Sequence, residues 1–511
     1  MPGPESIQWA RLFELPAPSA LPLQARLRLA VVQAILDGRL AAGAALPSSR
    51  ELAAVLGISR NTVTASYLQL VDEGFLQARP RSGVFVAAGA LPAAPLAAEP
   101  LHGISGQPGQ PPQWSVRVLR SVADRPTLAK PAQWRDYRYP FVYGSHDAEL
   151  FPTEAFRECC AKSLARSQLP RWTPDLEADD LPELVEQIRT RLLPRRGVFA
   201  LTEEIILTVG TQHAYTLLAE ALLDGTTRLG LEEPGHPHAR NSFALRQPRI
   251  VEVGVDGDGL VVDAMPAVDY LFVTPSHQSP TTATLSLERR QRLLRKSELQ
   301  DFVLIEDDYE AENLYAGTPM PALKSLDKSG RVIYIGSVSK SLSPALRLGY
   351  IVAPRALVDE LRQLRHAMLR HPSAFLQHAY ALFLSLGHHE SHARRVNQVM
   401  RERLAVAAGA LAEFLPEFVF TLPQGGASIW VQAPDWVDGA ELAQAARGRG
   451  VLIEAGEPFF ARPSYPCPFF RLRLSSIAAA RIVAGVQALG AAVSELAAAR
   501  GVQRPPRRPA H

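Results

Sequence analysis

The segment GSVSKSLSPALRLGY, residues 336–350, carries the side chains with the most specific chemistry in this sequence. A lysine such as Lys340 can carry an aldehyde cofactor as a Schiff base if its neighbours grip a cofactor phosphate and protonate a pyridine ring. Ser337 and Ser339 can donate hydroxyl groups to that phosphate, and Arg347 can add a charge-assisted pair. A lone serine–lysine pattern is more often a surface lysine beside serines than a lysine that holds a cofactor. The surrounding sequence therefore decides which of these two roles Lys340 is expected to have.

Two other segments supply the groups that such a cofactor needs. The apolar stretch IILTVG runs into a helix at Gly210, Thr211 and Gln212, where free backbone amides can bind the same anion. In FVLIEDDYEAE, Asp307 stands at the end of a strand and could keep a pyridine nitrogen protonated, so that the ring acts as an electron sink. Tyr309 would then hydrogen-bond the phenolic oxygen. This context favours the cofactor interpretation of the lysine.

These side chains lie at the ends of apolar runs that alternate with helical patterns. Continuous apolar strands between helices indicate a mostly parallel sheet covered on both faces, which is an α/β fold. The runs are IILTVG (205–210), YLFVTP (270–275), FVLIEDD (302–308), VIYIGS (332–337) and LGYIVAP (348–354).

The amino-terminal part has a different pattern, that of successive short helices. A first helix is indicated by apolar residues at helical spacing. Ser48 and Glu51 fit a capping box at the start of a second helix, and Gly57 suits the left-handed residue that ends it. Ser59 can cap a third helix. The apolar residues of the first helix are Leu27, Ala30, Val31, Ala34 and Ile35.

Polar residues at the start of the third helix are placed to read DNA. Arg60, Asn61 and Thr62 would lie exposed in its first turn and reach the major groove, as in a helix-turn-helix. The segment FLQARPRSGVFV then predicts a hairpin with a basic tip for the DNA backbone or minor groove. A bundle that only mediates protein contacts is disfavoured, because Arg60 and Arg81 stand where DNA needs them. The hairpin tip comprises Arg79, Pro80, Arg81, Ser82 and Gly83.

Composition divides the chain and limits its class. Residues 16–88 are expected to form the winged helix-turn-helix domain, 89–134 an Ala/Pro-rich linker, 135–498 the large domain and 499–511 a disordered tail. The net charge of +3 excludes a histone-like polycation. Three cysteines without metal-ligand spacing, and the lack of a signal-peptide pattern, predict a cytoplasmic protein with no metal site and no membrane segment.

The amino-terminal motifs PSSRELAAVLGISRNTV and EGFLQARPRSGVFV resemble the GntR family of bacterial winged-helix regulators. The resemblance implies that DNA is contacted by Arg50, Ser59, Arg60, Asn61 and the wing from Arg81 to Gly83. Arg81 departs from the family pattern, since these regulators usually carry Gly at this position.

The later motifs resemble the fold type I aminotransferases that use pyridoxal 5'-phosphate (PLP), and residues 20–490 as a whole resemble the MocR/GabR group of chimeric regulators. The matching stretches include GSHDAELFP, EEPGHPHAR, TPSHQSPTT, EDDYEAE and SKSLSPALRLGY. This resemblance implies PLP on Lys340, with Asp307 at the pyridine nitrogen, Tyr309 at O3′, and Ser337 and Arg347 at the phosphate.

The same resemblance assigns a ligand carboxylate to an arginine near the end of the chain. In FRLRLSS, Arg473 stands where the family binds such a carboxylate, a role suited to the planar guanidinium fork. Arg471 is the alternative. Arg473 could instead pair with a carboxylate of the protein itself.

Four departures from the aminotransferase pattern stand out. His236 replaces the usual Tyr that packs on the pyridine face. Thr282 replaces the Gly of a PTG turn, and Ser279 stands where aminotransferases carry the Asn that contacts O3′. The segment RWTPDLEADDLPEL (171–184), which contains Asp180, lacks the Tyr and Gly expected in the part that reaches the partner subunit's site. These changes favour retained cofactor binding over fast catalysis.

The sequence therefore predicts a transcriptional regulator that binds double-stranded promoter DNA and senses a small amine, an amino acid or PLP. Resemblance implies a head-to-tail homodimer with swapped DNA-binding domains. One alternative is a metabolic aminotransferase with an accessory winged helix, which the departures disfavour; any transamination is expected to stop at a half-reaction. The other is a DNA-binding dimer that no longer uses PLP, which the retained Lys340, Asp307, Tyr309 and Arg347 disfavour.

Overall fold

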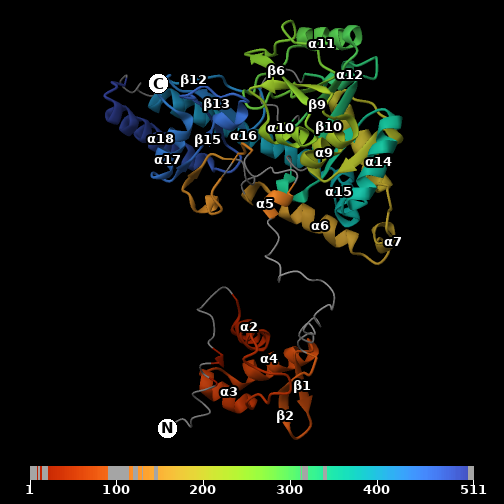
Figure 1. Ribbon diagram of the computed structural model, residues 1–511, viewed down its shortest axis with the longest axis vertical. Coiled ribbons are helices and arrows are strands. Elements are labelled where there is room, and N and C mark those ends of the chain that lie inside the picture. Colours follow the sequence, from red (N-terminus) through yellow and green to blue (C-terminus); the bar gives the residue numbers. More distant parts are fainter. Residues whose placement is uncertain are drawn as a thin grey trace, which may run out of the picture. The chain divides into compact units, whose positions relative to one another are not determined.

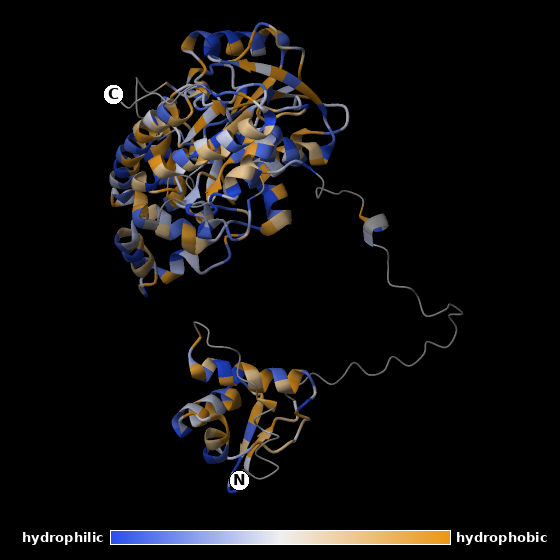
Figure 2. Cartoon of the chain, turned by 90° about the vertical axis from the view of Figure 1, so that its left-hand side faces the viewer, coloured by the Kyte–Doolittle hydropathy of each residue, from blue (hydrophilic) through white to orange (hydrophobic). Residues whose placement is uncertain are grey.

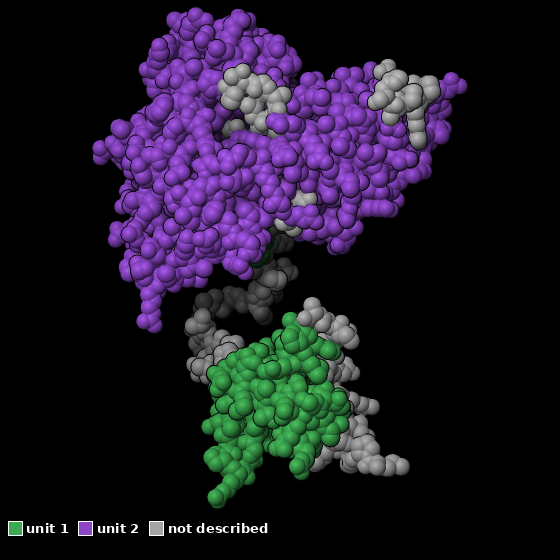
Figure 3. Space-filling model, turned by 180° about the vertical axis from the view of Figure 1, so that it is seen from behind, with its two compact units in different colours: residues 1–117 green, residues 118–511 purple. Residues whose placement is uncertain are grey.

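The computed structural model describes residues 9, 12–13, 21–89, 114–118, 125–128, 130–142, 148–310, 312, 320–337 and 342–504. The chain divides into two compact units, residues 1–117 and residues 118–511, which Figure 3 shows in different colours. Each unit has its own hydrophobic core.

The amino-terminal unit packs helices against an antiparallel hairpin (Figure 1). The predicted inner face of the first helix is confirmed, because its five apolar residues are all buried. Leu27, Val31, Ala34 and Ile35 pack in one core with Leu52, Val63 and Leu70 of the next two helices. The elements are α2 (Leu23–Leu36), α3 (Ser49–Leu56), α4 (Arg60–Asp72), β1 (Leu76–Arg79) and β2 (Gly83–Val86).

The predicted helix ends of this unit are confirmed. The Glu51 N–H donates to Ser48 Oγ at 3.2 Å, and Gly57 ends α3 with a φ of +66°. The Thr62 N–H donates to Ser59 Oγ at 3.1 Å at the start of α4. These caps fix the turn between α3 and α4, and with it the direction of the exposed first turn of α4.

The carboxy-terminal unit contains an eight-stranded sheet in the order β4-β11-β10-β9-β8-β5-β6-β7. The β10, β9, β8, β5 and β6 strands are parallel neighbours, whereas β11 runs antiparallel to both β10 and β4. The five apolar runs found in the sequence correspond to β4, β8, β9, β10 and β11. The strands are β4 (Ile205–Thr208), β5 (Arg228–Glu233), β6 (Arg249–Asp256), β7 (Gly259–Leu260), β8 (Tyr270–Val273), β9 (Val303–Asp307), β10 (Val332–Ser337) and β11 (Gly349–Val352).

Helices cover both faces of this sheet, which explains why β4, β8, β10 and β11 are apolar along most of their length. Ile305 and Ile333 pack on one face in the core that α9, α10 and α14 share. Leu304 and Val332 pack on the other face, in the core that includes α11. Figure 2 shows hydrophobic residues along the strands and hydrophilic residues over α11. The helices are α6 (Thr153–Ser163), α8 (Pro182–Gln187), α9 (Gly210–Leu222), α10 (Pro237–Phe243), α11 (Leu287–Gln300), α12 (Leu323–Leu326), α14 (Arg355–Leu369) and α15 (Ala374–Ser385).

A second, smaller lobe of this unit is built on the antiparallel sheet β12-β13-β16-β15. Its core joins this sheet to α16, α17 and α18, which are blue in Figure 1. The short strands β3 and β14 pair in parallel beside it. The elements are β3 (Tyr139–Pro140), α16 (His388–Phe414), β12 (Val419–Phe420), β13 (Ser428–Gln432), α17 (Gly439–Arg447), β14 (Val451–Leu452), β15 (Glu454–Ala455), β16 (Phe469–Arg473) and α18 (Ala479–Arg500).

Within the described part of the chain, α18 is the single helix long and apolar enough to cross a membrane by length and composition. Its residues Ile482, Val486 and Leu489 are fully buried in the core of the small lobe. Gly485 lies against the Phe141 ring, where a Cβ would come within 2.7 Å of a ring carbon. The length and apolar character of α18 are therefore accounted for by packing inside the lobe.

The described residues near the two ends of this unit also contact it. Arg125 donates to the Ala244 carbonyl at 3.2 Å, and the Asn241 amide donates to the Pro126 carbonyl at 2.8 Å. After α18, Arg504 forms an ion pair with Glu417 at 2.6 Å. Most of the expected linker and residues 505–511 of the expected tail lie outside the described residues.

Candidate functional site

A cavity of about 220 Å³ lies where the start of α9 meets the segment after β9 and the end of β16. Most residues predicted from the sequence to contact a cofactor or its ligand meet here: Thr211, Gln212, His236, Ser279, Tyr309, Arg347 and Arg473. Leu128, Tyr215, His238 and Arg471 complete the lining. Segments separated by up to 345 positions in the sequence thus converge on one cavity, since Leu128 and Arg473 both line it.

Two predicted residues of the lysine segment, Ser339 and Lys340, lie outside the described residues. Ser337 is described as the last residue of β10 and is half-buried. Asp307 is the last residue of the neighbouring parallel strand β9. Ser337 and Asp307 therefore both stand at the carboxyl edge of the sheet, the edge where ligands of open α/β sheets bind.

The start of α9 forms a cradle suited to an anion. Gly210 has a φ of +74°, and a Cβ at this position would come within 3.3 Å of the guanidinium carbon of Arg347. Arg347 donates to the Val209 carbonyl at 3.0 Å, which holds its guanidinium group beside the helix start. The first-turn amides of a helix have no partner within the helix, so amides and guanidinium together form a donor set that fits a phosphate.

His213, in the next position of this turn after Gln212, adds no positive charge. Its Nδ1 accepts the Val209 N–H at 3.0 Å. Burial, helped by the charges of Arg365 and Arg347, lowers the pKa of His213 to about 4. The ring is therefore neutral near pH 7, and the positive charge at this end of the cavity comes from Arg347.

Asp307 is buried and accepts a hydrogen bond from the hydroxyl group of Tyr215, through its Oδ2 atom. Burial and then the charge of Asp307 raise the pKa of Tyr215 well above its ordinary value, so the phenol stays protonated and donates. Asp307 itself is not among the lining residues, but Tyr215 and Tyr309 are, so this oriented carboxylate lies behind the cavity wall. A carboxylate held in this way fits the pyridine nitrogen of PLP.

Tyr215 was not predicted as a site residue. A signal was present, because Tyr215 lies four residues after Thr211 and therefore on the same face of α9. Which side chain that face would meet depended on β9, more than eighty positions later in the sequence. The pattern of the helix alone could not supply that information.

A second buried carboxylate, Glu232, supports the cavity wall from β5. Burial raises its pKa to about 7, and the charge of Asp307 adds to the rise, whereas hydrogen bonds from Thr274 and Gln278 oppose it. The Thr274 hydroxyl donates to Glu232 at 2.5 Å and accepts the Ser279 N–H at 3.1 Å. This chain of hydrogen bonds holds Ser279 in the cavity wall.

His236 lines the cavity as the residue that caps α10. Its Nδ1 accepts the Ala239 N–H at 3.3 Å, which fixes the orientation of the ring. The centre of the ring lies 6.2 Å from that of Tyr215 at an interplanar angle of 66°. His236 thus presents an aromatic ring to the cavity, with less area than the Tyr that the aminotransferase pattern would place there.

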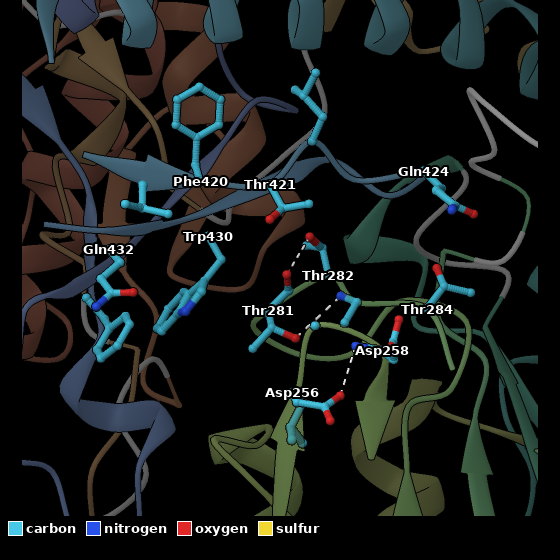
Figure 4. Close-up of a pocket in the computed structure, with 16 residues that line it drawn as sticks. Asp256, Asp258, Thr281, Thr282, Thr284, Phe420, Thr421, Gln424, Trp430 and Gln432 are labelled. Carbon is cyan, nitrogen blue, oxygen red and sulfur yellow. Dashed lines mark hydrogen bonds between the residues drawn. The ribbon is translucent and has the colours of Figure 1, made fainter. Parts of the chain in front are cut away.

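Thr282, the other departure near this loop, lies in a strained backbone position. Its φ is +63°, a left-handed conformation that favours Gly. It lines a second cavity of about 330 Å³ between the two lobes, where Thr281 and Thr282 lie beside Trp430 and Thr421, and Thr284 lies below Gln424 in the view of Figure 4. The described residues lining this second cavity include no lysine or arginine, so they offer no cation to a phosphate. The residues suited to PLP are those of the first cavity.

Arg471 and Arg473 both line the first cavity, since alternate residues of a strand share a face. The Arg471 Nε donates to Glu454 at 2.7 Å. Arg473 forms an ion pair with Glu310 through Nη2 and donates to Ser428 Oγ at 3.2 Å through Nη1. Both arginines are therefore paired with a carboxylate of the protein while they face the cavity.

The segment 171–184 is held by contacts with α14 and β4. Asp180 is buried and forms an ion pair with Arg365 of α14 at 2.6 Å. Its other oxygen accepts the Leu207 N–H of β4 at 2.9 Å, and Arg365 donates to the Leu207 carbonyl at 2.7 Å. Asp180 thus joins this segment to the strand that leads into α9.

In the amino-terminal unit, the predicted DNA contacts lie on the surface. Arg50, Ser59, Arg60 and Asn61 are exposed, and Thr62 is half-buried. The Thr62 hydroxyl is 2.9 Å from that of Ser59, so these two side chains serve the cap of α4. Arg60 Nε donates to Ser49 Oγ at 3.4 Å, which orients the Arg60 side chain toward α3.

The wing has the basic tip that the sequence predicted, with Arg79, Arg81, Ser82 and Gly83 all exposed. Arg79 pairs with Gly83 across the hairpin, and its guanidinium lies 4.4 Å from the centre of the Phe85 ring. Arg81 has a φ of +62°. Because Gly adopts this conformation without strain, the backbone explains why Gly is the usual residue at this position.

Comparisons with known proteins agree with this division. Residues 23–86 match the family described as bacterial regulatory proteins, gntR family, and residues 172–489 match aminotransferase class I and II. The chain is 41% identical over 472 residues to the HTH-type transcriptional regulator TauR of Rhodobacter capsulatus, covering 92% of this chain and 96% of that protein. It is 34% identical to the probable rhizopine catabolism regulatory protein MocR of Rhizobium meliloti, covering 82% and 83% of the two chains.

The solved structure of LysN, an alpha-aminoadipate aminotransferase from Thermus thermophilus, superimposes with a TM-score of 0.65 at 29% identity. The match covers 70% of this chain and 92% of LysN, which was crystallised with N-(5'-phosphopyridoxyl)-L-leucine.

The fold and the cavity therefore define an aminotransferase class I and II domain joined to a gntR-family winged helix-turn-helix. The chain belongs to the MocR-type HTH-type transcriptional regulators, the family of TauR and MocR.

Proposed function

We propose that this regulator binds double-stranded promoter DNA through α4 and the wing, and that its aminotransferase-like domain holds PLP and senses a small amine or amino acid, or PLP itself. The observation that supports this proposal most is one cavity that combines an anion cradle at the start of α9, two arginines, and Tyr215, which holds the buried carboxylate of Asp307. The phosphopyridoxyl ligand of LysN, a structural relative, supports the choice of cofactor.

Each part of the cofactor has a matching group in this chain. The phosphate would be held at the start of α9 and by the side chains around Lys340, and Lys340 itself would hold the cofactor covalently. When bound, PLP supplies an aldehyde that condenses with amines and a ring that withdraws electrons. The proposed phosphate ligands are Gly210, Thr211, Gln212, Ser337, Ser339 and Arg347.

The remaining side chains would orient the ring and the ligand. Asp307, held by Tyr215, would keep the pyridine nitrogen protonated. Tyr309 and Ser279 would contact the phenolic oxygen, and burial followed by the charge of Glu310 raises the pKa of Tyr309, so that it stays a hydrogen-bond donor. His236 would cover the ring face, and Arg473 would receive a ligand carboxylate.

The proposal extends to assembly and location. The protein would act in the cytoplasm as a head-to-tail homodimer with swapped DNA-binding domains. The two DNA-binding domains of the dimer would then contact two half-sites in the promoter DNA. The proposed parts are a reading domain at 16–88, a linker at 89–134, an effector domain at 135–498 and a tail at 499–511. Ligand binding in the effector domain would then alter the DNA affinity of both DNA-binding domains.

Arg60→Ala tests the DNA-reading half of the proposal. Arg60 is exposed in the first turn of α4, the part of a recognition helix that meets base edges and phosphates. The substitution should weaken specific binding by about 1 to 3 kcal/mol, which is roughly a 5- to 150-fold rise in Kd. Kd is measured with the full chain on the fragment that genome-wide binding mapping identifies, starting with the region upstream of its own gene.

Arg39→Ala is the matched control, because Arg39 is an exposed arginine of the same unit that pairs with Asp37 outside the predicted DNA contacts. It should change Kd much less than Arg60→Ala. Equal effects of the two substitutions would mean that only net charge matters and would remove α4 from the role of recognition helix.

A further inference from the structure

The two arginines that face the cavity are held by their carboxylate partners in different ways. Arg471 is fixed within the small lobe, where Glu454 of β15 binds it at 2.7 Å and the Phe459 ring centre lies 4.6 Å from its guanidinium carbon. The partner of Arg473 is Glu310, which comes from the large lobe, three residues after Asp307. The ion pair between Arg473 and Glu310 therefore joins the two lobes beside the cavity, which Arg473 lines.

Glu310 makes a second contact with the small lobe. Its Oε2 accepts the N–H of Ala427, just before β13, at 3.1 Å, while its Oε1 meets Arg473 at the end of β16. Gly426 leaves room for this carboxylate, since a Cβ there would lie 3.2 Å from Glu310 Oε2. Glu310 thus connects the segment after β9 to the start of β13 and to β16 of the small lobe.

Glu310 makes these contacts from a backbone conformation that is unfavourable for it. Its φ is +56°, in the left-handed region that favours Gly. Its side chain and that of Arg473 are both nearly excluded from solvent. The contacts that Glu310 makes with Arg473 and Ala427 therefore hold a residue that would otherwise leave this conformation readily.

A ligand carboxylate that enters the cavity meets an arginine that is already neutralised. Two carboxylates on one buried guanidinium repel each other, because like charges at short distance are costly in a low dielectric. A ligand can therefore reach Arg473 only by taking the place of Glu310. An amine without a carboxylate has no such competition and leaves the contacts of Glu310 intact.

We propose that Glu310 is an internal substitute for the ligand carboxylate, and that a ligand carboxylate replaces it on Arg473 and thereby releases the tie between the two lobes. This inference rests on the proposed role of Arg473 in the effector site. This exchange would let the domain distinguish carboxylated ligands from simple amines. Only a carboxylated ligand would release the contact between the two lobes.

Glu310→Gln tests the inference in the full chain loaded with PLP. Gln keeps the size of the side chain and can still accept the Ala427 N–H, but it no longer competes by charge for Arg473. L-leucine and isoamylamine, which differ by the carboxylate, are titrated while the visible spectrum of the bound cofactor is followed. We expect the half-saturating leucine concentration to fall about tenfold in Glu310→Gln and that of isoamylamine to stay unchanged.

The matched control is Glu454→Gln, which alters the equivalent partner of Arg471. It should leave the leucine to isoamylamine ratio as in the wild type. The inference would be overturned if the half-saturating leucine concentration of Glu310→Gln were equal to or higher than that of the wild type. It would also be overturned if neither protein responded to leucine. A wild-type protein that acquires no visible band with PLP would instead refute the proposed function.

Hydrogen exchange at the Ala427 amide gives a second readout that does not depend on the spectrum. Saturating leucine should speed exchange of the wild-type peptide that contains Ala427, to the level seen in Glu310→Ala without ligand. Isoamylamine should leave it unchanged. Exchange at Ala427 that leucine does not alter would overturn the proposed release.

Discussion

Asp180→Ala is expected to lower the free energy of unfolding of the carboxy-terminal unit by about 3 to 5 kcal/mol. Asp180 and Arg365 form an ion pair whose side chains are 2% and 0% exposed. Removing the carboxylate leaves the Arg365 charge buried without its counter-ion and the Leu207 N–H without its acceptor. Urea unfolding of the full chain, followed by tryptophan fluorescence, measures the loss as a lower midpoint.

Asp179→Ala is the control, because Asp179 is the adjacent residue and is exposed. It should change stability by no more than about 0.5 kcal/mol. If both substitutions lower the midpoint equally, the Asp180–Arg365 pair does not stabilise this unit and the segment 171–184 needs another explanation.

Asp307→Asn is expected to weaken PLP binding by about 10- to 150-fold, the effect of losing a charge-assisted hydrogen bond of about 1.5 to 3 kcal/mol. The substitution keeps the shape of the side chain and an acceptor for the Tyr215 hydroxyl, so the cavity wall should remain. What it removes is the negative charge that would keep the pyridine nitrogen protonated. Equilibrium dialysis of the purified apo chain against PLP gives Kd directly.

Glu306→Gln provides the comparison from the opposite face of the same strand. Glu306 accepts the N–H groups of Leu323 and Lys324 and is fully buried, and burial raises its pKa. Gln keeps one of the two oxygen acceptors and places an NH2 group at the other N–H, but Glu306 is not among the residues that line the cavity, so PLP affinity should stay close to that of the wild type. An affinity that Asp307→Asn leaves unchanged would remove Asp307 from the cofactor site.

The strands and the helix ends of this fold could be predicted from the sequence because their signals are local. A run such as VIYIGS is apolar because helices cover both faces of its strand, and Ser48, Ser59 and Gly57 act on residues at most four positions away. Strand direction was less accessible. The strand β11 is antiparallel to its neighbours, yet it is as apolar as the parallel strands beside it.

The parts of the site that sequence reasoning missed depend on contacts between distant segments. Tyr215 enters the candidate site only when its hydroxyl is seen on Asp307, and Glu310 only when it is seen on Arg473, 163 positions later. Glu232 likewise acts through the loop that carries Ser279. In each case the residue type was visible, but its partner was set by the packing of the sheet and the two lobes.

Two of the departures from family patterns have a common physical basis. Arg81 and Thr282 both have a φ near +60° and stand where the sequence patterns that this chain resembles have Gly. Both residues thus adopt a backbone conformation that Gly favours. At Arg81 the change adds a positive charge to the wing, and at Thr282 it adds a hydroxyl to the wall of the second cavity.

The most direct test of the account is the visible absorption of the purified full chain after incubation with PLP and removal of the excess. We expect a visible band in the wild type that is absent from Lys340→Ala, while far-ultraviolet circular dichroism shows that the variant is folded. A colourless wild type, or a band of equal intensity in folded Lys340→Ala, would contradict the claim that this regulator holds PLP on Lys340.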